Sequence, residues 1–260
     1  MTETALDTAF VAMESNAGDD AQRLRFFEAL AASELYLLLQ SEPRGDNIEP
    51  RIFETSEGRF VLIFDREDRL TAFADGPAPY AALPGRTIAD MLQDQDIGLG
   101  LNLGVAPSSY LIPAGAVAWL AETLGSRPEE RDDTPETFTS PGNLPERLLS
   151  ALDARLARAA GLADLAYLAR ATYDSGRRSH LLAIVDAVPG AEETLARAVQ
   201  EALTFSGLDA GEIDVTFLKA SDAAAGQLAR VGLRFDLPKA EIPTAPSAPG
   251  MDPNSPPRLK

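Results

Sequence analysis

The residue types that carry most enzyme chemistry are nearly absent from this chain. Among 260 residues there is no Cys and one His, His180, which excludes thiol nucleophiles, disulfides, thiolate metal sites and multi-histidine zinc clusters. There is no Gly-x-Ser-x-Gly elbow, and Lys219, Lys239 and Lys260 form no phosphate-cradling Gly-Lys motif. His180 opens an expected strand, where a packed or exposed imidazole is favoured over a catalytic one. We therefore expect no catalytic residue, no cofactor and no enzyme activity.

Acidic side chains gather in two polar turns, and neither turn matches a cation site. Asp65, Glu67 and Asp68 occupy the first turn, and Asp94 and Asp96 the second. A calcium-binding loop needs alternating acidic oxygens, a central Gly and a terminal Glu, and both turns lack part of this pattern. Carboxylate pairs for glycosidase chemistry are not identifiable either, because 40 acidic residues make chance pairs common. We expect solvated turn carboxylates and no metal.

The most distinctive local pattern is the run Gly-Leu-Gly-Leu-Asn-Leu-Gly-Val at residues 98–105. In a strand, the leucines and the valine would share one face, and Gly98, Gly100, Asn102 and Gly104 would leave the other nearly bare. It is no dinucleotide fingerprint, because Pro107 and a second strand follow instead of a helix. Close backbone packing or a bulge is one interpretation. The other makes these four residues candidates for binding a ligand or partner.

Trp119 is the other candidate binding residue. It lies about 200° round an expected helix from Val117, away from the core face. We expect it to anchor an interface or to contact the flanking sheet.

The charge balance limits the classes of partner. Forty acidic against 23 basic residues give a net charge of -17, which repels nucleic acid and anionic lipid surfaces. Residues 97–121 carry no charge and could span a bilayer on length alone, but Pro107 and Pro113 would break that helix. The N-terminus lacks the pattern of a secretory signal. We expect a cytoplasmic protein that binds neither nucleic acid nor membrane.

Hydrophobic spacing predicts helices, then a sheet, then a closing helix in the first half of the chain. Apolar residues recur at helical spacing over 6–17 and 24–31, and Asp19-Asp20 can cap the second helix. The apolar run 35–39 favours a central strand, and Ser56-Glu57-Gly58 favours a hairpin. The expected strands are 35–39, 52–55, 59–64, 69–73, 97–103 and 110–112, with helical turns at 80–83 and 87–93, the latter capped by Thr87, and a helix from Pro113 to Gly125.

The second half alternates helices and strands after a proline-interrupted stretch. Helices are expected at 148–159, 191–205 and 223–231, and strands at 165–173, 180–185, 213–218 and 233–237. We predict an α/β (α+β) fold with two small domains, each a mixed β-sheet packed with helices. The expected domains are residues 1–126 and 143–238, joined by an acidic proline-containing linker at 127–142 and followed by a disordered proline-rich tail at 239–260.

The order of these features resembles a known family. The resemblance runs through Arg25-Phe26-Phe27, Glu34 to Leu38, Gly58 to Phe64, Arg69 to Phe73 and Gly100 to Gly104. These segments are similar to the N-terminal domain of the SseB family, the enhanced serine sensitivity proteins of bacteria, and residues 148–237 resemble that family's C-terminal domain. The resemblance implies a cytoplasmic bacterial protein without established catalytic residues, linked by name to a serine-related phenotype.

Two functions from different classes follow as expectations. The first is a non-enzymatic adaptor or regulatory protein that binds a protein partner through its surface. The alternative is a module that binds a small molecule such as an amino acid, either at the face of Gly98 to Gly104 or between the two domains.

Overall fold

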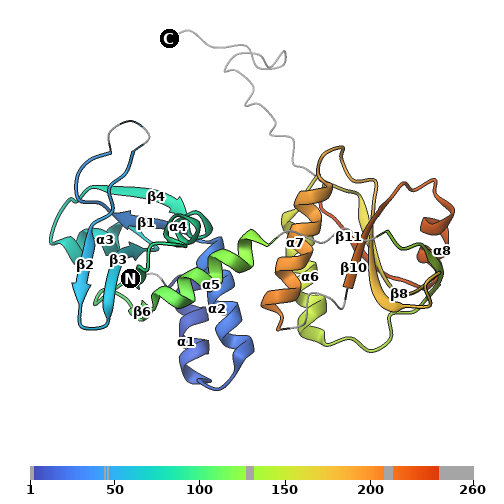
Figure 1. Cartoon of the computed structure of the whole chain (residues 1–260), viewed down its shortest axis with the longest axis horizontal. Helices are drawn as coiled ribbons and strands as arrows, with labels where there is room; N and C mark the ends of the chain where they lie inside the picture. Colours follow the sequence, from blue (N-terminus) through green and yellow to red (C-terminus); the bar gives the residue numbers. More distant parts are fainter. Residues whose placement is uncertain (1–2, 44, 46, 127–131, 208–212, 240–260) are drawn as a thin grey trace, which may run out of the picture.

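Each half of the chain forms one mixed β-sheet, and helices lie between the two sheets (Figure 1). The computed structural model describes residues 3–43, 45, 47–126, 132–207 and 213–239. Below, the first half is 3–126 and the second half is 132–239. The predicted fold class is confirmed.

The first sheet is built from the hairpin and the apolar strands that the sequence predicts. Its strands lie in the order β4-β1-β3-β5-β6, and β2 pairs with β3. β3 and β5 run parallel and the other pairs antiparallel. The strands are β1 (Glu34–Leu38), β2 (Ile52–Thr55), β3 (Gly58–Phe64), β4 (Tyr80–Pro84), β5 (Gly98–Leu101) and β6 (Tyr110–Ile112).

Helices cover both faces of this sheet because its central strands are apolar on both sides. Leu35 and Leu37 of β1 join the core under four helices, while Leu38 faces a smaller cluster under the fifth, as a period of two requires. Asp19 caps one of these helices by accepting from the Ala21 amide. The four are α1 (Ala5–Ser15), α2 (Asp20–Ala32), α4 (Gly85–Leu92) and α5 (Ala114–Gly125), and the fifth is α3 (Glu67–Ala74).

The second sheet has the order β10-β9-β8-β11, with β7 paired to β8. Two helices, α6 and α7, cover one face, and α8 packs on the other. β9 and β10 run parallel, which makes this sheet mixed as well. The elements are β7 (Pro135–Thr139), α6 (Glu146–Arg158), β8 (Leu165–Tyr173), β9 (Arg178–Val185), α7 (Glu192–Phe205), β10 (Ile213–Leu218), α8 (Ala223–Val231) and β11 (Leu233–Asp236).

Two element predictions in the first half are wrong in type. Residues 69–73 are not a strand but part of α3, whose first turn holds Glu67 and Asp68, where acidic side chains suit the helix dipole. Residues 80–83 are not helical but belong to β4, which pairs with β1 along its whole length. There the Tyr80 ring lies 5.2 Å from that of Tyr36, a cross-strand contact that supports an edge strand.

Two boundaries also differ from the prediction. Thr87 does not cap α4, which begins at Gly85 after Pro84. A Cβ on Gly85 would lie 2.0 Å from the Leu30 carbonyl oxygen, so only glycine lets α4 begin so close to α2. Residues 135–139 of the expected linker form β7, which pairs with β8. Residues 127–131 and 240–260 lie outside the described residues, and the proposed domain limits stay a prediction.

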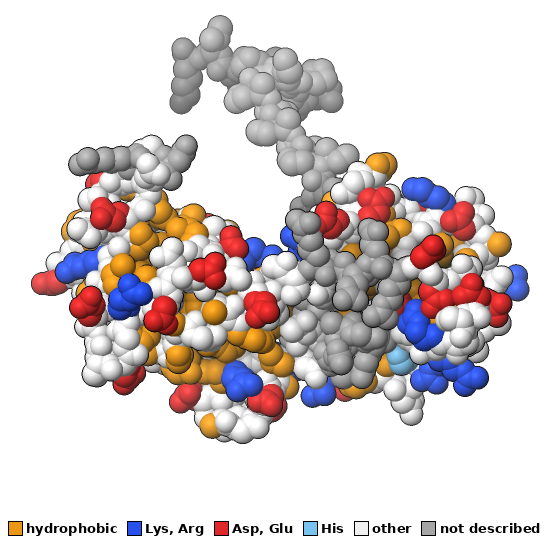
Figure 2. Space-filling view, in the orientation of Figure 1, with side chains coloured by type: hydrophobic (Ala, Val, Ile, Leu, Met, Phe, Trp, Pro, Cys, Tyr) orange, Lys and Arg blue, Asp and Glu red, His pale blue; other side chains and the backbone are white. Residues whose placement is uncertain are grey.

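Acidic and basic side chains are interspersed over the face shown in Figure 2. Within the part of the chain that the structure describes, no helix has the length and apolar character needed to cross a membrane.

Candidate functional site

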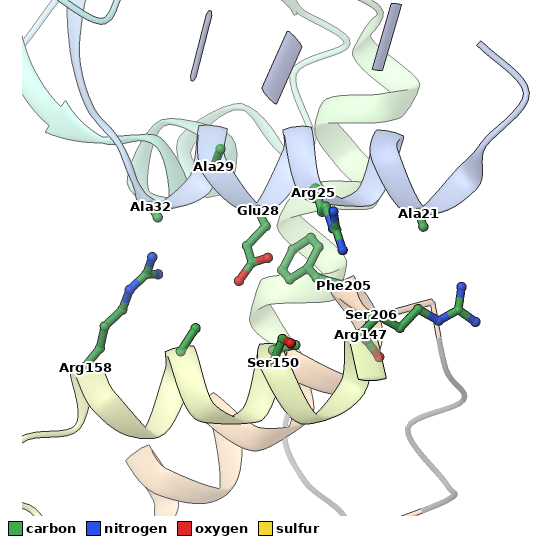
Figure 3. Close-up of a pocket in the computed structure, with 12 residues that line it drawn as sticks. Ala21, Arg25, Glu28, Ala29, Ala32, Arg147, Ser150, Arg158, Phe205 and Ser206 are labelled. Carbon is green, nitrogen blue, oxygen red and sulfur yellow. The ribbon is translucent and has the colours of Figure 1, made fainter. Parts of the chain in front are cut away.

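A groove of about 300 Å³ lies between the two halves of the chain, with α2 on one side and α6 on the other. Figure 3 shows the two helices facing each other across it, with Phe205 of α7 between them. Glu28 points into this space from α2, and Arg158 points into it from α6. The groove is therefore built from residues more than a hundred positions apart in the sequence.

The α6 side of the groove is a stripe of two arginines flanking two alanines. Arg147, Ala151, Ala154 and Arg158 all line it, and their i, i+4, i+7, i+11 spacing places them on one side of a helix. The neighbouring stripe of α6, which includes Leu152, is buried in the core of the second half. The small side chains keep the middle of the groove open, and an arginine stands at each end.

The α2 side repeats the same spacing with the charges in the middle. Ala21, Arg25, Glu28 and Ala32 line the groove, whereas Phe26 and other apolar residues on the opposite side of α2 are buried in the first-half core. The outer face of α2 is thus directed at the second half of the chain.

Three arginines of the groove have no acidic partner among the described residues. Arg25, Arg147 and Arg158 are exposed and form none of the ion pairs found in the described part of the chain. Glu28, the one acidic side chain among the described residues that line the groove, is already paired with Arg155 at 3.2 Å. The groove therefore carries positive charge in a chain whose net charge is -17, and it can attract an anionic group.

Aromatic rings hold the two halves together at the base of the groove. Phe205, at the end of α7, is 2% exposed and belongs to the core cluster of the first half. Trp119 lies with its ring centroid 6.5 Å from that of Phe205 and 5.4 Å from that of Phe27, both edge-on, a favoured aromatic geometry. This contact joins α5, α7 and α2.

A chain of ion pairs crosses the same junction. Arg155 of α6 lies 3.1 Å from Glu201 of α7 and 3.2 Å from Glu28 of α2. Glu201 also lies 3.2 Å from Arg86 of α4. The central side chains, Arg155 and Glu201, are 9% and 5% exposed, whereas Glu28 and Arg86 at the two ends are 24% and 42% exposed, so only the central pair is shielded from water. Together with the aromatic contact, this chain fixes α2 relative to α6 and so positions the groove.

A second polar cluster is buried inside the first half. Arg69 of α3 donates to Asp7 of α1 at 3.0 Å and to Asp65 at 2.8 Å, and the two residues of the Arg69–Asp7 pair are 2% and 1% exposed. Ser108 also donates to Asp7, and Asn102 donates to Ser108 at 2.8 Å. Burial alone would raise the pKa of Asp7, but hydrogen bonds from Arg69 and Ser108 outweigh it and hold that pKa well below its ordinary value. The cluster ties α1, α3 and the loop after β5 together.

A third cluster closes the hairpin between β8 and β9. The Tyr173 hydroxyl donates to Asp214 at 2.6 Å, and Arg177 contacts Asp214 at 2.8 Å and Asp133 at 3.1 Å. Burial, together with the Asp214 carboxylate, raises the pKa of Tyr173 above its ordinary value. A tyrosine in this state is a poor nucleophile at neutral pH, so the cluster is suited to holding the hairpin and β10 together. Among the described residues, no group of three or more His, Asp or Glu could hold a metal.

The glycines that the sequence singled out lie inside the first sheet. A Cβ on Gly98 would lie 2.5 Å from the Ile112 carbonyl oxygen, and one on Gly100 would lie 2.5 Å from Leu62. Their bare side is thus filled by the chain's own atoms, as the close-packing interpretation describes.

Asn102 and Gly104 form the turn that follows this strand. Asn102 is fully buried with a φ of 45°, and it accepts a hydrogen bond from the Asp65 amide. Gly104 has a φ of 71°, a conformation that favours glycine, and its amide donates to Ser109. The binding role suggested for Gly98, Gly100, Asn102 and Gly104 stays a prediction.

The remaining sequence candidates are placed as follows. Trp119 is 37% exposed, and the interface it joins lies between the halves of its own chain. A role for its exposed part in binding another protein stays a prediction. His180 lies 3.1 Å from the Pro141 carbonyl oxygen and is partly buried, which fits the packed imidazole expected for it.

The space between the two domains was one of the possible binding sites expected from the sequence, but the residues of the groove were not identified there, although one signal was present. The Arg-Ala-Ala-Arg stripe of α6 follows helical spacing directly beside the apolar stripe, and that pattern can be found without a structure. The facing stripe of α2 and the ion pairs of Arg155 depend on how the two halves pack, which the sequence does not show.

Comparison with known proteins supports the resemblance found in the sequence. Residues 6–119 match the family model described as SseB protein N-terminal domain, and this range spans the first sheet and most of its helices. No curated protein and no solved structure matches the chain. Residues 6–119 therefore form an SseB protein N-terminal domain.

Proposed function

We propose that the chain is a non-enzymatic adaptor that binds a partner protein in the groove between α2 and α6. The observation that supports this is the set of Arg25, Arg147 and Arg158, three exposed arginines without an acidic partner among the described residues, around a floor of small side chains. Arginine is enriched where proteins bind one another. The lack of cysteine and the single histidine argue against catalysis as the main role.

The proposal includes a compartment and a phenotype. The match of residues 6–119 to the SseB N-terminal domain favours a bacterial cytoplasmic protein connected with serine sensitivity. The groove gives such an adaptor a defined surface through which a partner could be regulated.

Affinity capture with matched variants tests the adaptor. The full chain, tagged and immobilised, is incubated with bacterial lysate beside the groove variant R25A/R147A/R158A. The control R170A/R178A/R230A removes the same charge at exposed arginines that line no part of the groove. We expect the wild type and the control to retain one stoichiometric partner that the groove variant loses. Repeated recovery of no such partner, or equal recovery by both variants, contradicts the proposal.

A second candidate is supported by the size of the groove. About 300 Å³ is at the lower end of the range for small-molecule sites, and arginine binds carboxylates, so the groove could hold a free amino acid. A thermal-shift screen with amino acids, serine included, separates the candidates. A ligand at about 100 times its Kd adds about 2.7 kcal/mol to the free energy of unfolding. A screen without a shift contradicts this second candidate.

A further inference from the structure

The two end arginines of the groove define how long its occupant is. Arg147 and Arg158 are eleven residues apart on α6, about three helical turns, so both lie on the groove side. At a rise of about 1.5 Å per residue, their Cα atoms are about 16 Å apart. An extended chain advances about 3.3 Å per residue, and a segment of about five residues therefore covers the distance.

The width of the groove favours an extended segment over a helix. Ala151 and Ala154 line the middle of its α6 side. Arg155 of α6 pairs directly with Glu28 of α2 at 3.2 Å, so the two helices stay too close there for a further helix, about 10 Å wide, to lie between them. Ser150 also lines the groove, and its hydroxyl can bond a backbone amide or carbonyl of a bound strand.

Charge complementarity decides what the segment carries at its ends. The net charge of -17 repels acidic partners at long range, but salt screens exposed charges beyond about 8 Å at physiological ionic strength. Among the described residues that line the groove, an occupant contacts the exposed Arg25, Arg147 and Arg158, while Glu28 is held by Arg155. The local attraction therefore exceeds the distant repulsion. A free dicarboxylate is much shorter than the distance between the end arginines and would engage only one of them.

Resting on the proposed function, we infer that the groove binds an extended acidic segment of the partner protein. One carboxylate of the segment pairs with Arg147. Another, four residues further along and therefore on the same face of the extended segment, pairs with Arg158; the four residues advance about 13 Å, and the long arginine side chains span the remaining distance. Small residues between them lie over Ala151 and Ala154. Arg25, from the α2 side, faces the middle of the segment, where it can bind a backbone carbonyl or a further acidic side chain.

Defined peptides test this inference on the full chain. The probe is fluorescein-labelled Gly-Glu-Ala-Gly-Ala-Glu-Gly, with two matched peptides in which both Glu are replaced by Lys or by Gln, and a third in which the two Glu are adjacent. Binding is followed by fluorescence anisotropy at low and physiological salt. The proteins are the wild type, R147E/R158E, and the control R170E/R178E, which makes the same charge change at exposed arginines outside the groove. Thermal unfolding shows whether each variant is folded.

We expect the spaced acidic peptide to bind the wild type and R170E/R178E with equal affinity. Its affinity for R147E/R158E should be lower by about tenfold. R147E/R158E should in turn prefer the Lys peptide. Equal binding of acidic, neutral and basic peptides, equal binding to R147E/R158E and the wild type, or equal binding of spaced and adjacent Glu overturns the inference. So does competition by free glutamate at the same concentration as the peptide. If affinity capture still shows a groove-dependent partner, these outcomes do not contradict the adaptor function. The proposed adaptor function and the inferred acidic segment can therefore fail separately.

Discussion

Replacing Arg69 by Met removes the cation from the buried cluster of the first half and leaves two carboxylates facing each other. Arg69, Asp7 and Asp65 have side chains that are 2%, 1% and 4% exposed, so water cannot take the place of the guanidinium. Methionine keeps much of the side-chain length, which limits the change to charge and hydrogen bonding. Removing one partner of a buried ion pair lowers the free energy of unfolding by about 3–5 kcal/mol. With two carboxylates left unpaired, we expect R69M to lie in the upper part of that range at pH 7.

The double variant R69M/D7N should recover part of the loss, because only Asp65 then stays charged. That residue keeps a 2.6 Å hydrogen bond from Thr4. Neighbouring groups of one network usually show interaction energies of about 0.5–3 kcal/mol in such a cycle. The matched control is R66M, whose ion pair with Asp68 is solvent-exposed. We expect R66M to change stability by about 0.5 kcal/mol or less.

The loss in R69M should depend on pH with a definite sign. In the wild type the pKa of Asp7 is lower in the folded protein than in the unfolded chain, so Asp7 stabilises the fold at neutral pH. That contribution is lost as the pH falls below about 4 towards the folded-state pKa. In R69M burial acts without the arginine and raises the pKa of Asp7, so protonation relieves the destabilisation. The cost of R69M should therefore be largest at pH 7 and shrink towards pH 4.

Urea unfolding followed by far-UV circular dichroism measures these differences, and emission from Trp119, the single tryptophan of the chain, reports on the first half and the junction. The reasoning is refuted if R69M lies within about 1 kcal/mol of the wild type at pH 7, or if its cost is the same at pH 7 and pH 4.5.

Two further predictions test the junction and the packed glycines. F205A removes a ring that is 2% exposed and lies against Trp119. It should lower the free energy of unfolding in urea by about 3–5 kcal/mol and shift the Trp119 emission to the red. An unchanged emission would contradict the contact. G98A should destabilise by about 1–3 kcal/mol, because its Cβ would lie 2.5 Å from the Ile112 carbonyl oxygen. Gly115 lies on α5, and a Cβ added there would have no other atom within 4 Å, so G115A should stabilise the fold by about 0.5 kcal/mol. Equal calorimetric shifts in Tm for G98A and G115A would argue against close packing at β5.

The sequence predicted those elements whose side chains repeat with one clear period. The apolar run at 35–39 became β1, and the leucines at 148, 152 and 156 became the buried stripe of α6. The short α3 was missed because its character comes from tertiary contacts. Its two buried residues, Arg69 and Leu70, are adjacent, and the partner that buries Arg69 lies 62 residues away.

The candidate site was less predictable than the fold for a related reason. Gly98 and Gly100 stand out in the sequence because their strand packs tightly, and close packing and ligand approach leave the same small-residue pattern. The groove instead depends on Arg147 and Arg158, which are exposed and look like ordinary surface charges until α2 is placed opposite them. Trp119 was correctly expected off the core face of its helix, but its neighbour across the interface, Phe205, is 86 residues further along the chain.

Site-specific photocrosslinking shows directly whether a partner protein binds between α2 and α6. A photoreactive amino acid is placed at Ser150, an exposed residue that lines the groove, and in a second protein at Arg230, an exposed residue of α8 on the far face of the second sheet. After irradiation in bacterial cells, we expect one protein adduct at position 150, which disappears when the same chain also carries the substitutions R25A/R147A/R158A. Absence of an adduct at position 150, or the same adduct at position 230, would contradict it.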